Sequence, residues 1–133
     1  MPTLTWQNKA QHTPAPANLH TEAWISPTND KKPKSRLFLG DNLAIMAALL
    51  PEYEGKLNLI YLDPPFFTNR KFPARIGRGE DSRKPHEWQM AEGYDDAWED
   101  LDAYLDFLYQ RLQLMYSLLA PNGTLYLHLD WHA

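Results

Sequence analysis

The stretch LNLIYLDPPF, residues 57–66, decides the fold class of this chain. Its first six residues form an almost uninterrupted apolar run, which is typical of a strand buried on both faces of a parallel sheet. Tyr61 is therefore expected to be buried. The two prolines that follow fix the backbone in an extended turn and cannot donate hydrogen bonds. Because ligands of open parallel sheets bind at the carboxyl ends of strands, this turn is expected at the ligand-binding edge.

The residues upstream predict a strand and a short helix. RLFLG (36–40) has the pattern of a short strand, and Asp41 occupies the position of a helix N-cap. Residues 42–50 follow as a helix that Pro51 should end. The apolar side of this helix is formed by Leu43, Met46, Leu49 and Leu50.

The residues from Ala97 onward predict a long helix and a further strand. Apolar residues recur at alternating steps of four and three, the stripe of an amphipathic helix, at Leu101, Leu105, Leu108, Leu112, Met115 and Leu119. The sequence PNG (121–123) should break this helix before a strand at 124–130. A strand, a helix and a strand form a crossover unit, so the two strands should be parallel. The predicted class is α/β, with a mainly parallel sheet.

Two segments lack such periodicity. Residues 1–35 are rich in Pro, Thr, Asn and Lys and are interpreted as a flexible arm, or as a segment that a partner orders. Trp6 and Trp24 are candidate anchors of this arm. Residues 63–96 are predicted to form a long loop, and long loops in compact domains are often functional. Residues 36–133 would then form one domain.

The composition excludes several classes of site. There is no cysteine, so disulfides, thiolate nucleophiles and zinc–sulfur sites are excluded. No apolar run approaches the roughly 18 residues of a membrane span, and the N-terminus lacks the layout of a secretory signal. We therefore expect a cytoplasmic protein.

The charge distribution leaves the partner open. The net charge of −4 works against binding to nucleic acid, yet basic residues cluster at 31–36 and 69–84, while acidic residues concentrate at 92–106. Solvated faces explain the same clusters. The candidate phosphate contacts in the loop are Arg70, Lys71, Arg75, Arg78, Arg83 and Lys84.

The turn after residues 57–62 suits an exocyclic aromatic amine as substrate. The carboxylate of Asp63 and the carbonyl of Pro64 can accept the two amino hydrogens and orient the nitrogen lone pair toward a methyl donor. Phe66 can stack on an extruded base. Stacking contributes about 1–3 kcal/mol, comparable with the few kcal/mol that extrusion costs. The alternative is a purely structural turn.

GDNL (40–43), the apolar strand and DPPF (63–66) together resemble the DNA amino-methyltransferases of restriction–modification systems. The resemblance is to the subgroup whose catalytic motif precedes the cofactor motif, and RLQLMYSLLAPNG (111–123) with TLYLHLD (124–130) extends it over residues 36–133. It implies a Rossmann-like methyltransferase fold, of which these residues would be the catalytic-motif part, truncated at the C-terminus. The Asp form of the motif favours N6 of adenine.

This resemblance also implies roles for individual residues. Asp63, Pro64, Pro65 and Phe66 would be catalytic, and Asp41 and Asp63 would lie at the cofactor. Phe67, where many relatives carry Asn, is with Phe66 a candidate for binding the target base. The implied cofactor is S-adenosyl-L-methionine, whose glycine-rich Phe-x-Gly-x-Gly loop is absent from this sequence. The implied partners are double-stranded DNA and a restriction subunit, and a homodimer is a further option.

Several alternatives stay open. An N4-cytosine, RNA or protein-amide methyltransferase would keep the chemistry, although the RNA and amide enzymes more often carry Asn at the Asp63 position. The last alternative is a DNA-binding fragment without catalytic activity. The 133 residues alone are expected to be inactive. His128, Asp130 and His132 share one side of a strand and can bind a metal, but ordinary apolar alternation explains their spacing.

Overall fold

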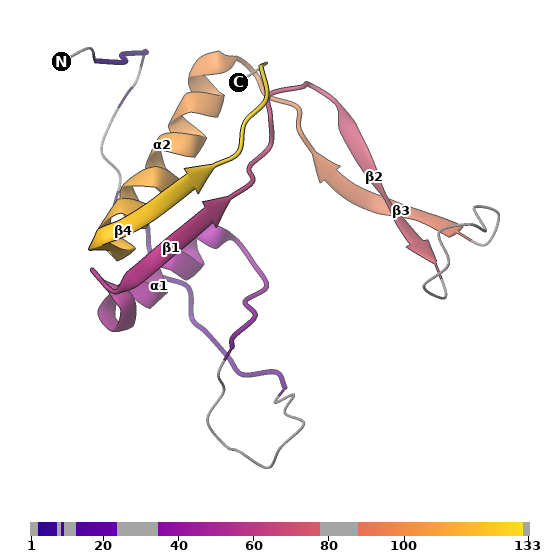
Figure 1. The fold of residues 1–133 in the computed structure, drawn as a ribbon. Coiled ribbons are helices and arrows are strands. Elements are labelled where there is room, and N and C mark those ends of the chain that lie inside the picture. The colour runs from indigo at the N-terminus through magenta and orange to yellow at the C-terminus, as the bar shows by residue number, and fades with distance from the viewer. Residues whose placement is uncertain (1–2, 8, 10–12, 24–34, 78–87, 132–133) are drawn as a thin grey trace.

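A computed structural model describes residues 3–7, 9, 13–23, 35–77 and 88–131. The elements in these ranges are α1 (Asn42–Tyr53), β1 (Leu57–Leu62), β2 (Lys71–Gly77), β3 (Trp88–Asp95), α2 (Leu101–Leu118) and β4 (Leu119–Leu127). The strands β1 and β4 form one sheet, and β2 and β3 form another. Both helices cover the same face of the β1–β4 pair, and the β2–β3 hairpin projects away from it (Figure 1).

The crossover unit expected from the sequence is confirmed. The strands β1 and β4 are parallel, with Cα partners that run from Leu59 and Thr124 to Leu62 and Leu127. One further bond, from the N–H of His128 to the carbonyl of Leu62 at 2.9 Å, continues the pairing past the end of β4. The α/β class with a parallel sheet therefore holds for the described residues.

The boundary between α2 and β4 differs from the prediction. The sequence PNG (121–123) lies inside β4, which begins at Leu119 and ends at Leu127, whereas a strand at 124–130 was expected. A register shift between Leu57 and Leu59 accommodates the extra residues of β4 as a bulge. Gly123 is needed there, because a Cβ atom would lie 2.7 Å from the carbonyl oxygen of Leu57.

The segment around α1 brings two corrections. Residues 36–40 are not a strand: Leu37 and Leu39 are fully exposed, and no described strand pairs with this segment. The helix also continues through Pro51 to Tyr53. Glu54 is its C-cap, and Gly55 follows with a φ of +65°, a left-handed conformation that favours glycine just after a helix C-terminus. At the other end, Asp41 caps the helix as predicted.

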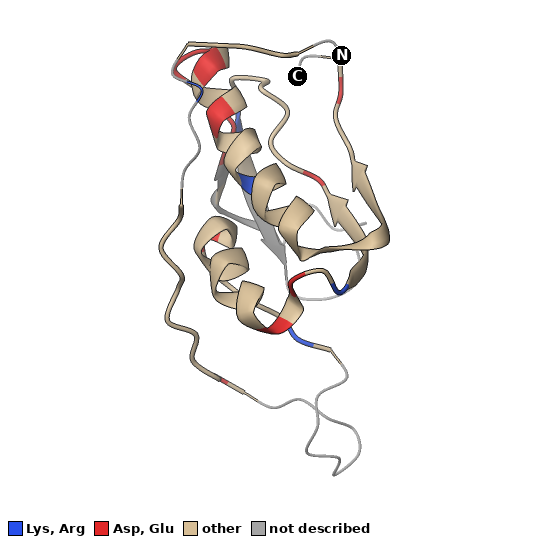
Figure 2. Ribbon diagram, turned by 90° about the vertical axis from the view of Figure 1, so that its left-hand side faces the viewer, with Lys and Arg blue, Asp and Glu red and all other residues tan. Residues whose placement is uncertain are grey.

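The burial of β1 on both faces was predicted wrongly for the described part of the chain. The side chains of Leu59 and Tyr61 are 60% and 65% exposed. The physical reason is that α1 and α2 both pack on one face of the sheet (Figure 2), so that the side chains on the other face are left uncovered. The expectation that Tyr61 is buried is therefore wrong.

The long loop predicted at 63–96 contains an antiparallel hairpin. Lys71 lies opposite Asp95, and Gly77 lies opposite Trp88. Pro73 and the glycines obscure the strand pattern in the sequence, and a register shift between Phe72 and Ala74 accommodates the proline. Three of the candidate phosphate contacts, Arg78, Arg83 and Lys84, lie outside the described residues, as does the tip of the hairpin.

The helix α2 is rotated relative to the predicted stripe. Asp100 caps its N-terminus by accepting from the N–H of Ala103 at 2.8 Å, and acidic residues gather at this end (Figure 2). Leu101 is 48% exposed, and Leu119 lies beyond the helix. The buried face consists of Tyr104, Leu108, Arg111, Leu114, Met115 and Leu118. Two polar side chains therefore enter the core.

Residues of the N-terminal arm lie along both helices. The indole N–H of Trp6 donates to Asp106, and its ring meets Tyr109 edge-on with centroids 5.3 Å apart. The N–H of Ala17 donates to the carbonyl of Ala44 at 2.9 Å. Trp6 thus contacts α2, whereas Trp24 lies outside the described residues. Neither α1 nor α2 has the length and apolar composition of a membrane-spanning helix.

Candidate active site

The turn formed by Asp63-Pro64-Pro65-Phe66 lies at the carboxyl end of β1, as the sequence predicts. Asp63 is exposed and follows the last residue of the strand directly. Pro64 is buried, while Pro65 and Phe66 are partly buried. The carboxylate is therefore accessible at the edge where parallel sheets bind ligands, and the backbone that carries it is packed into the protein.

Tyr104 of α2 anchors this turn. Its hydroxyl donates to the carbonyl oxygen of Pro65 at 2.9 Å, and its side chain is 1% exposed. Burial, together with the charges of Asp96 and Asp130, raises the pKa of Tyr104 above its ordinary value. The hydroxyl therefore stays protonated at neutral pH and remains a donor to the turn.

The two aromatic rings that follow the prolines lie in different surroundings. The ring of Phe66 meets His128 edge-on, with centroids 5.4 Å apart. The ring of Phe67 meets Tyr104, with centroids 5.5 Å apart and planes tilted by 43°. Phe66 thus packs next to the end of β4, and Phe67 packs on α2, so the two candidates for stacking on a base are not equivalent.

Arg111 organises the N-terminus of α1. The Oδ1 atom of Asp41 accepts from the N–H of Leu43 at 2.7 Å and lies 3.6 Å from Nη2 of Arg111. The guanidinium also donates to Oδ1 of Asn42 at 2.7 Å and to the carbonyl of Phe107 at 3.0 Å. Burial lowers the pKa of Arg111, while the charge of Asp41 opposes this shift, and an arginine stays charged in either case.

The buried face of α2 links the two parts of the site. Tyr104 and Arg111 are seven residues apart, which places them on one face of the helix about 10 Å apart along its axis. One holds the turn after β1, and the other holds the start of α1. The side chain of Asp41 is 63% exposed at this point, so both predicted carboxylates are accessible on elements fixed by the same helix.

Sequence reasoning missed four residues that build this region: Asp96, Trp98, Tyr104 and Arg111. The helix offered a signal, since a tyrosine and an arginine seven residues apart mark the same face as Leu108 and Met115. Asp96 offered none, because it is one of many acidic residues between 92 and 106. Only the fold distinguishes this buried carboxylate from its exposed neighbours.

The remaining candidates from the sequence are less well defined. Arg70 and Lys71 are exposed at the base of the hairpin, and Lys71 pairs with Asp95 at 3.3 Å. The side chain of Arg75 is not described. His128 contacts Phe66, whereas His132 lies outside the described residues. Among the residues that are described, no group of three His, Asp or Glu side chains has the arrangement of a metal site.

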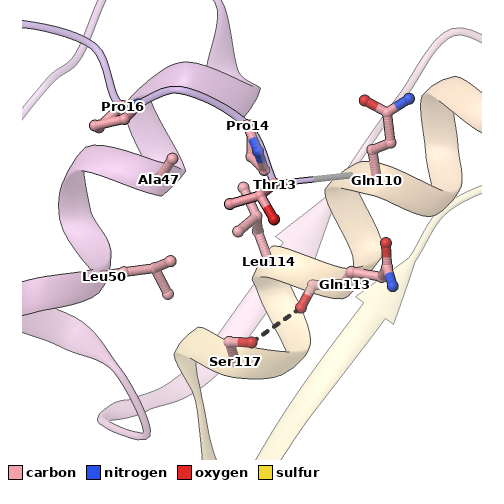
Figure 3. Close-up of a pocket in the computed structure, with 9 residues that line it drawn as sticks. All are labelled: Thr13, Pro14, Pro16, Ala47, Leu50, Gln110, Gln113, Leu114 and Ser117. Atoms are coloured by element: carbon pink, nitrogen blue, oxygen red, sulfur yellow. Dashed lines mark hydrogen bonds between the residues drawn. The ribbon is translucent and has the colours of Figure 1, made fainter. Parts of the chain in front are cut away.

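A groove of about 340 Å³ lies between the N-terminal arm and the two helices (Figure 3). It is lined by Thr13, Pro14, Pro16, Ala47, Leu50, Gln110, Gln113, Leu114 and Ser117. None of these side chains is ionisable, and none belongs to the turn after β1. The groove therefore lacks the groups needed for proton or methyl transfer, and the accessible edge at Asp63 is the better candidate.

A family model described as DNA methylase (N6_N4_Mtase) matches residues 57–133. The chain is similar to the Type II methyltransferase M.EcaI of Enterobacter cloacae, with 34% identity over 98 residues, covering 73% of this chain and 18% of that protein. It is also similar to the Type III restriction-modification enzyme EcoPI Mod subunit of Escherichia phage P1, with 27% identity over 111 residues, 76% of this chain and 17% of that protein.

A third relative is the probable type III restriction-modification enzyme HindVI Mod subunit of Haemophilus influenzae. It is 29% identical over 103 residues, which are 77% of this chain and 11% of that protein. The chain thus spans less than a fifth of the length of these relatives. No solved structure matches it significantly.

Proposed function

Since the chain belongs to the DNA methylase family, we propose that the complete protein methylates N6 of adenine in double-stranded DNA, with S-adenosylmethionine as the methyl donor. The observation that carries this proposal is the exposed carboxylate of Asp63 at the carboxyl end of β1, on a backbone held by Pro64 and by Tyr104. An exposed acceptor on a rigid turn is what an exocyclic amine needs in order to be oriented before reaction.

The residues of the turn have distinct roles in this mechanism. The Asp63 carboxylate and the Pro64 carbonyl accept the two amino hydrogens, so that the nitrogen lone pair points away from both. Phe66 stacks on the extruded base, with Phe67 as the second wall of the pocket. Pro65 keeps the turn rigid, and its carbonyl is held by Tyr104 at 2.9 Å.

The exposed carboxylates fit the proposed cofactor. S-adenosylmethionine carries an ammonium group and ribose hydroxyls, and Asp41 and Asp63 are both accessible acceptors for such donors. When bound, the cofactor supplies an electrophilic methyl group. Transfer of this methyl to the base nitrogen would break the sulfur–methyl bond and leave a neutral thioether, and Asp63 would take the extra proton of the nitrogen and pass it to solvent. Such a direct transfer needs neither a metal nor a covalent intermediate on the protein.

The wider setting is part of the same proposal. The parallel β1–β4 pair with its helices would be one part of a Rossmann-like sheet. The names of two relatives describe Mod subunits of type III restriction-modification enzymes, which supports a restriction subunit as partner. Base extrusion, a cytoplasmic location and the choice of adenine over cytosine also belong to the proposal. Asp63 is the residue that favours adenine.

Methyl transfer from labelled S-adenosylmethionine to unmethylated genomic DNA tests this function in the complete protein. The DNA is digested to nucleosides, and the modified nucleoside is identified by mass. We expect N6-methyladenine, whereas N4-methylcytosine would correct the base and keep the mechanism. Absence of any methylated nucleoside from a folded complete protein would reject the function in favour of the RNA, amide or noncatalytic alternatives.

Asp63→Ala tests the mechanism. Loss of one acceptor for the amine should lower methyl transfer by more than about a hundredfold, since single transition-state contacts of this kind contribute that much. Glu99→Ala removes an exposed carboxylate outside the turn and should leave turnover unchanged. Full turnover of a folded Asp63→Ala protein would refute the assigned role.

A further inference from the structure

Asp96 is a buried carboxylate just after the hairpin, and it is 1% exposed. A carboxylate this deeply buried is costly unless each oxygen is hydrogen-bonded. Its Oδ1 accepts from the N–H of Phe67 at 3.1 Å and from the indole N–H of Trp98 at 2.8 Å. Its Oδ2 accepts from the N–H and the hydroxyl of Thr68, at 2.8 and 2.6 Å.

The four donors explain why Asp96 remains ionised in the protein. Burial raises the pKa of Asp96, but the hydrogen bonds from Thr68, Trp98 and Phe67 outweigh burial and leave the pKa below its ordinary value. The carboxylate is therefore charged at neutral pH. Three of its bonds come from Phe67 and Thr68, which follow the Asp63-Pro64-Pro65-Phe66 turn directly.

The backbone that Asp96 holds is strained. Phe67 and Asn69 have φ angles of +59° and +55°, in the left-handed region that bulky residues rarely adopt. Such a conformation is unfavourable, above all for a bulky residue such as Phe67, and persists only where its surroundings impose it. The side chain of Asn69 adds one more link, since its Oδ1 accepts from the N–H of Trp98 at 3.1 Å.

We propose that Asp96 is a positioning residue of the methyl-transfer site, which fixes the Phe67–Asn69 backbone and through it the aromatic wall against which the target base is held. This inference rests on the proposed function. To the residues of the proposed site it adds Asp96, which contacts neither base nor cofactor. Without the carboxylate, the strained backbone relaxes, and the Phe67 ring leaves its place against Tyr104.

Asn at this position cannot replace Asp, and the geometry shows why. An amide has one acceptor atom and one donor group, whereas all three N–H groups around Asp96 are obligatory donors. If the amide nitrogen replaces Oδ1, it meets the N–H groups of Phe67 and Trp98. If it replaces Oδ2, it meets the N–H of Thr68. Either orientation loses at least one bond to the strained backbone.

The test compares Asp96→Asn with wild type in the complete protein, using unmethylated genomic DNA as substrate. We expect kcat to fall about tenfold to a hundredfold, the usual effect of misplacing a reacting group slightly. The KM for S-adenosylmethionine and the dissociation constant for DNA should change by less than about twofold, because loss of positioning acts on the reaction step and not on ground-state binding.

A second measurement does not depend on activity. Hydrogen exchange should be about tenfold faster in Asp96→Asn at the amide of Phe67 or of Thr68, because the single amide oxygen can accept from only one of the two. Asp95→Asn is the matched control: Asp95 is exposed, and it accepts from the N–H of Ala97 at 3.0 Å, a bond that an asparagine keeps. This control should match wild type in kcat and in exchange.

Thr68→Val keeps the proposal testable if Asp96→Asn does not fold. It removes only the hydroxyl donor to Asp96, retains the backbone N–H, and should lower kcat several-fold with unchanged KM. Unchanged kcat and unchanged exchange in a folded variant would overturn the proposal while leaving the proposed function intact. An inactive wild type would reject the proposed function, and with it the positioning role, even if exchange shows that Asp96 holds the backbone.

Discussion

Tyr104→Phe removes one hydrogen bond to the turn formed by Asp63-Pro64-Pro65-Phe66. The variant loses the 2.9 Å bond to the Pro65 carbonyl and keeps the ring, whose contacts with Phe67 and Trp98 have centroid separations of 5.5 and 5.3 Å. The change in volume is limited to one hydroxyl group, because the ring is retained. The effect of the variant is therefore that of the hydroxyl alone.

The expected magnitude follows from the surroundings of this bond. A neutral hydrogen bond contributes about 0.5–1.5 kcal/mol, and a stranded buried acceptor adds to the cost of losing it. The bond is partly buried, so we expect a loss near the middle of this range, about 1 kcal/mol. This corresponds to about a fivefold change in the equilibrium between the held and the displaced turn.

Hydrogen exchange and steady-state methyl transfer measure this change in the complete protein. The amides of Phe67 and Thr68 should exchange about fivefold faster, and kcat should fall by no more than the same factor. Because the pKa of Tyr104 is raised, its hydroxyl stays protonated up to and beyond its ordinary pKa of 10.0. The bond is present below that value and is lost only as the pH rises through the raised pKa. The difference between variant and wild type should therefore be constant around neutral pH.

Two outcomes would refute this reasoning. Unchanged exchange would mean that the hydroxyl does not hold the turn. A loss of turnover beyond about a hundredfold would mean that it takes part in the chemistry, because a single positioning bond of this kind does not contribute that much. Tyr116→Phe is the control, since Tyr116 lies on the same helix and is 82% exposed.

Two further predictions concern the stability of the fold. Gly123→Ala places a Cβ atom 2.7 Å from the Leu57 carbonyl oxygen and should lower the free energy of unfolding by about 1–3 kcal/mol, as measured by thermal melting. Asn122→Ala, at the exposed neighbouring position, is the control and should have no such effect. If both variants melt at the same temperature, the bulge adapts to the added Cβ atom. The pKa of Asp96 is lowered from its ordinary 3.8, so the contribution of this carboxylate to stability is present above pH 3.8 and is lost as the pH falls through the lower folded pKa. The difference in the free energy of unfolding between wild type and Asp96→Asn should therefore disappear at acid pH. A difference that persists there would contradict the charged state of Asp96.

The sequence was sufficient to predict the crossover unit and the location of its turn. An apolar run that ends in Asp63-Pro64-Pro65 and an amphipathic helix before the next strand are local patterns, and local patterns predict element type well. The cap at Asp41 is of the same kind, since a side chain that accepts from an N–H two residues later needs no tertiary contact.

Features that depend on packing could not be predicted in this way. Residues 36–40 have a strand pattern but no partner strand in the described part of the chain, and Tyr61 is exposed because both helices cover the opposite face. The rotation of α2 brings Tyr104 and Arg111 inward, where Tyr104 binds the turn after β1 and Arg111 binds the start of α1. Asp96 is identified only by the four donors that surround it.

The β2–β3 hairpin leaves and rejoins the rest of the chain at almost the same point. Lys71 lies opposite Asp95, and directly beyond this pair the N–H of Asp96 donates to the carbonyl of Arg70 at 3.0 Å. The residues between Arg70 and Asp96 thus form a hairpin whose two ends are hydrogen-bonded to each other. Its length and sequence can therefore vary without displacing β1, α2 and β4. Insertions, deletions or exchanges of sequence between Arg70 and Asp96 should therefore be tolerated by the fold.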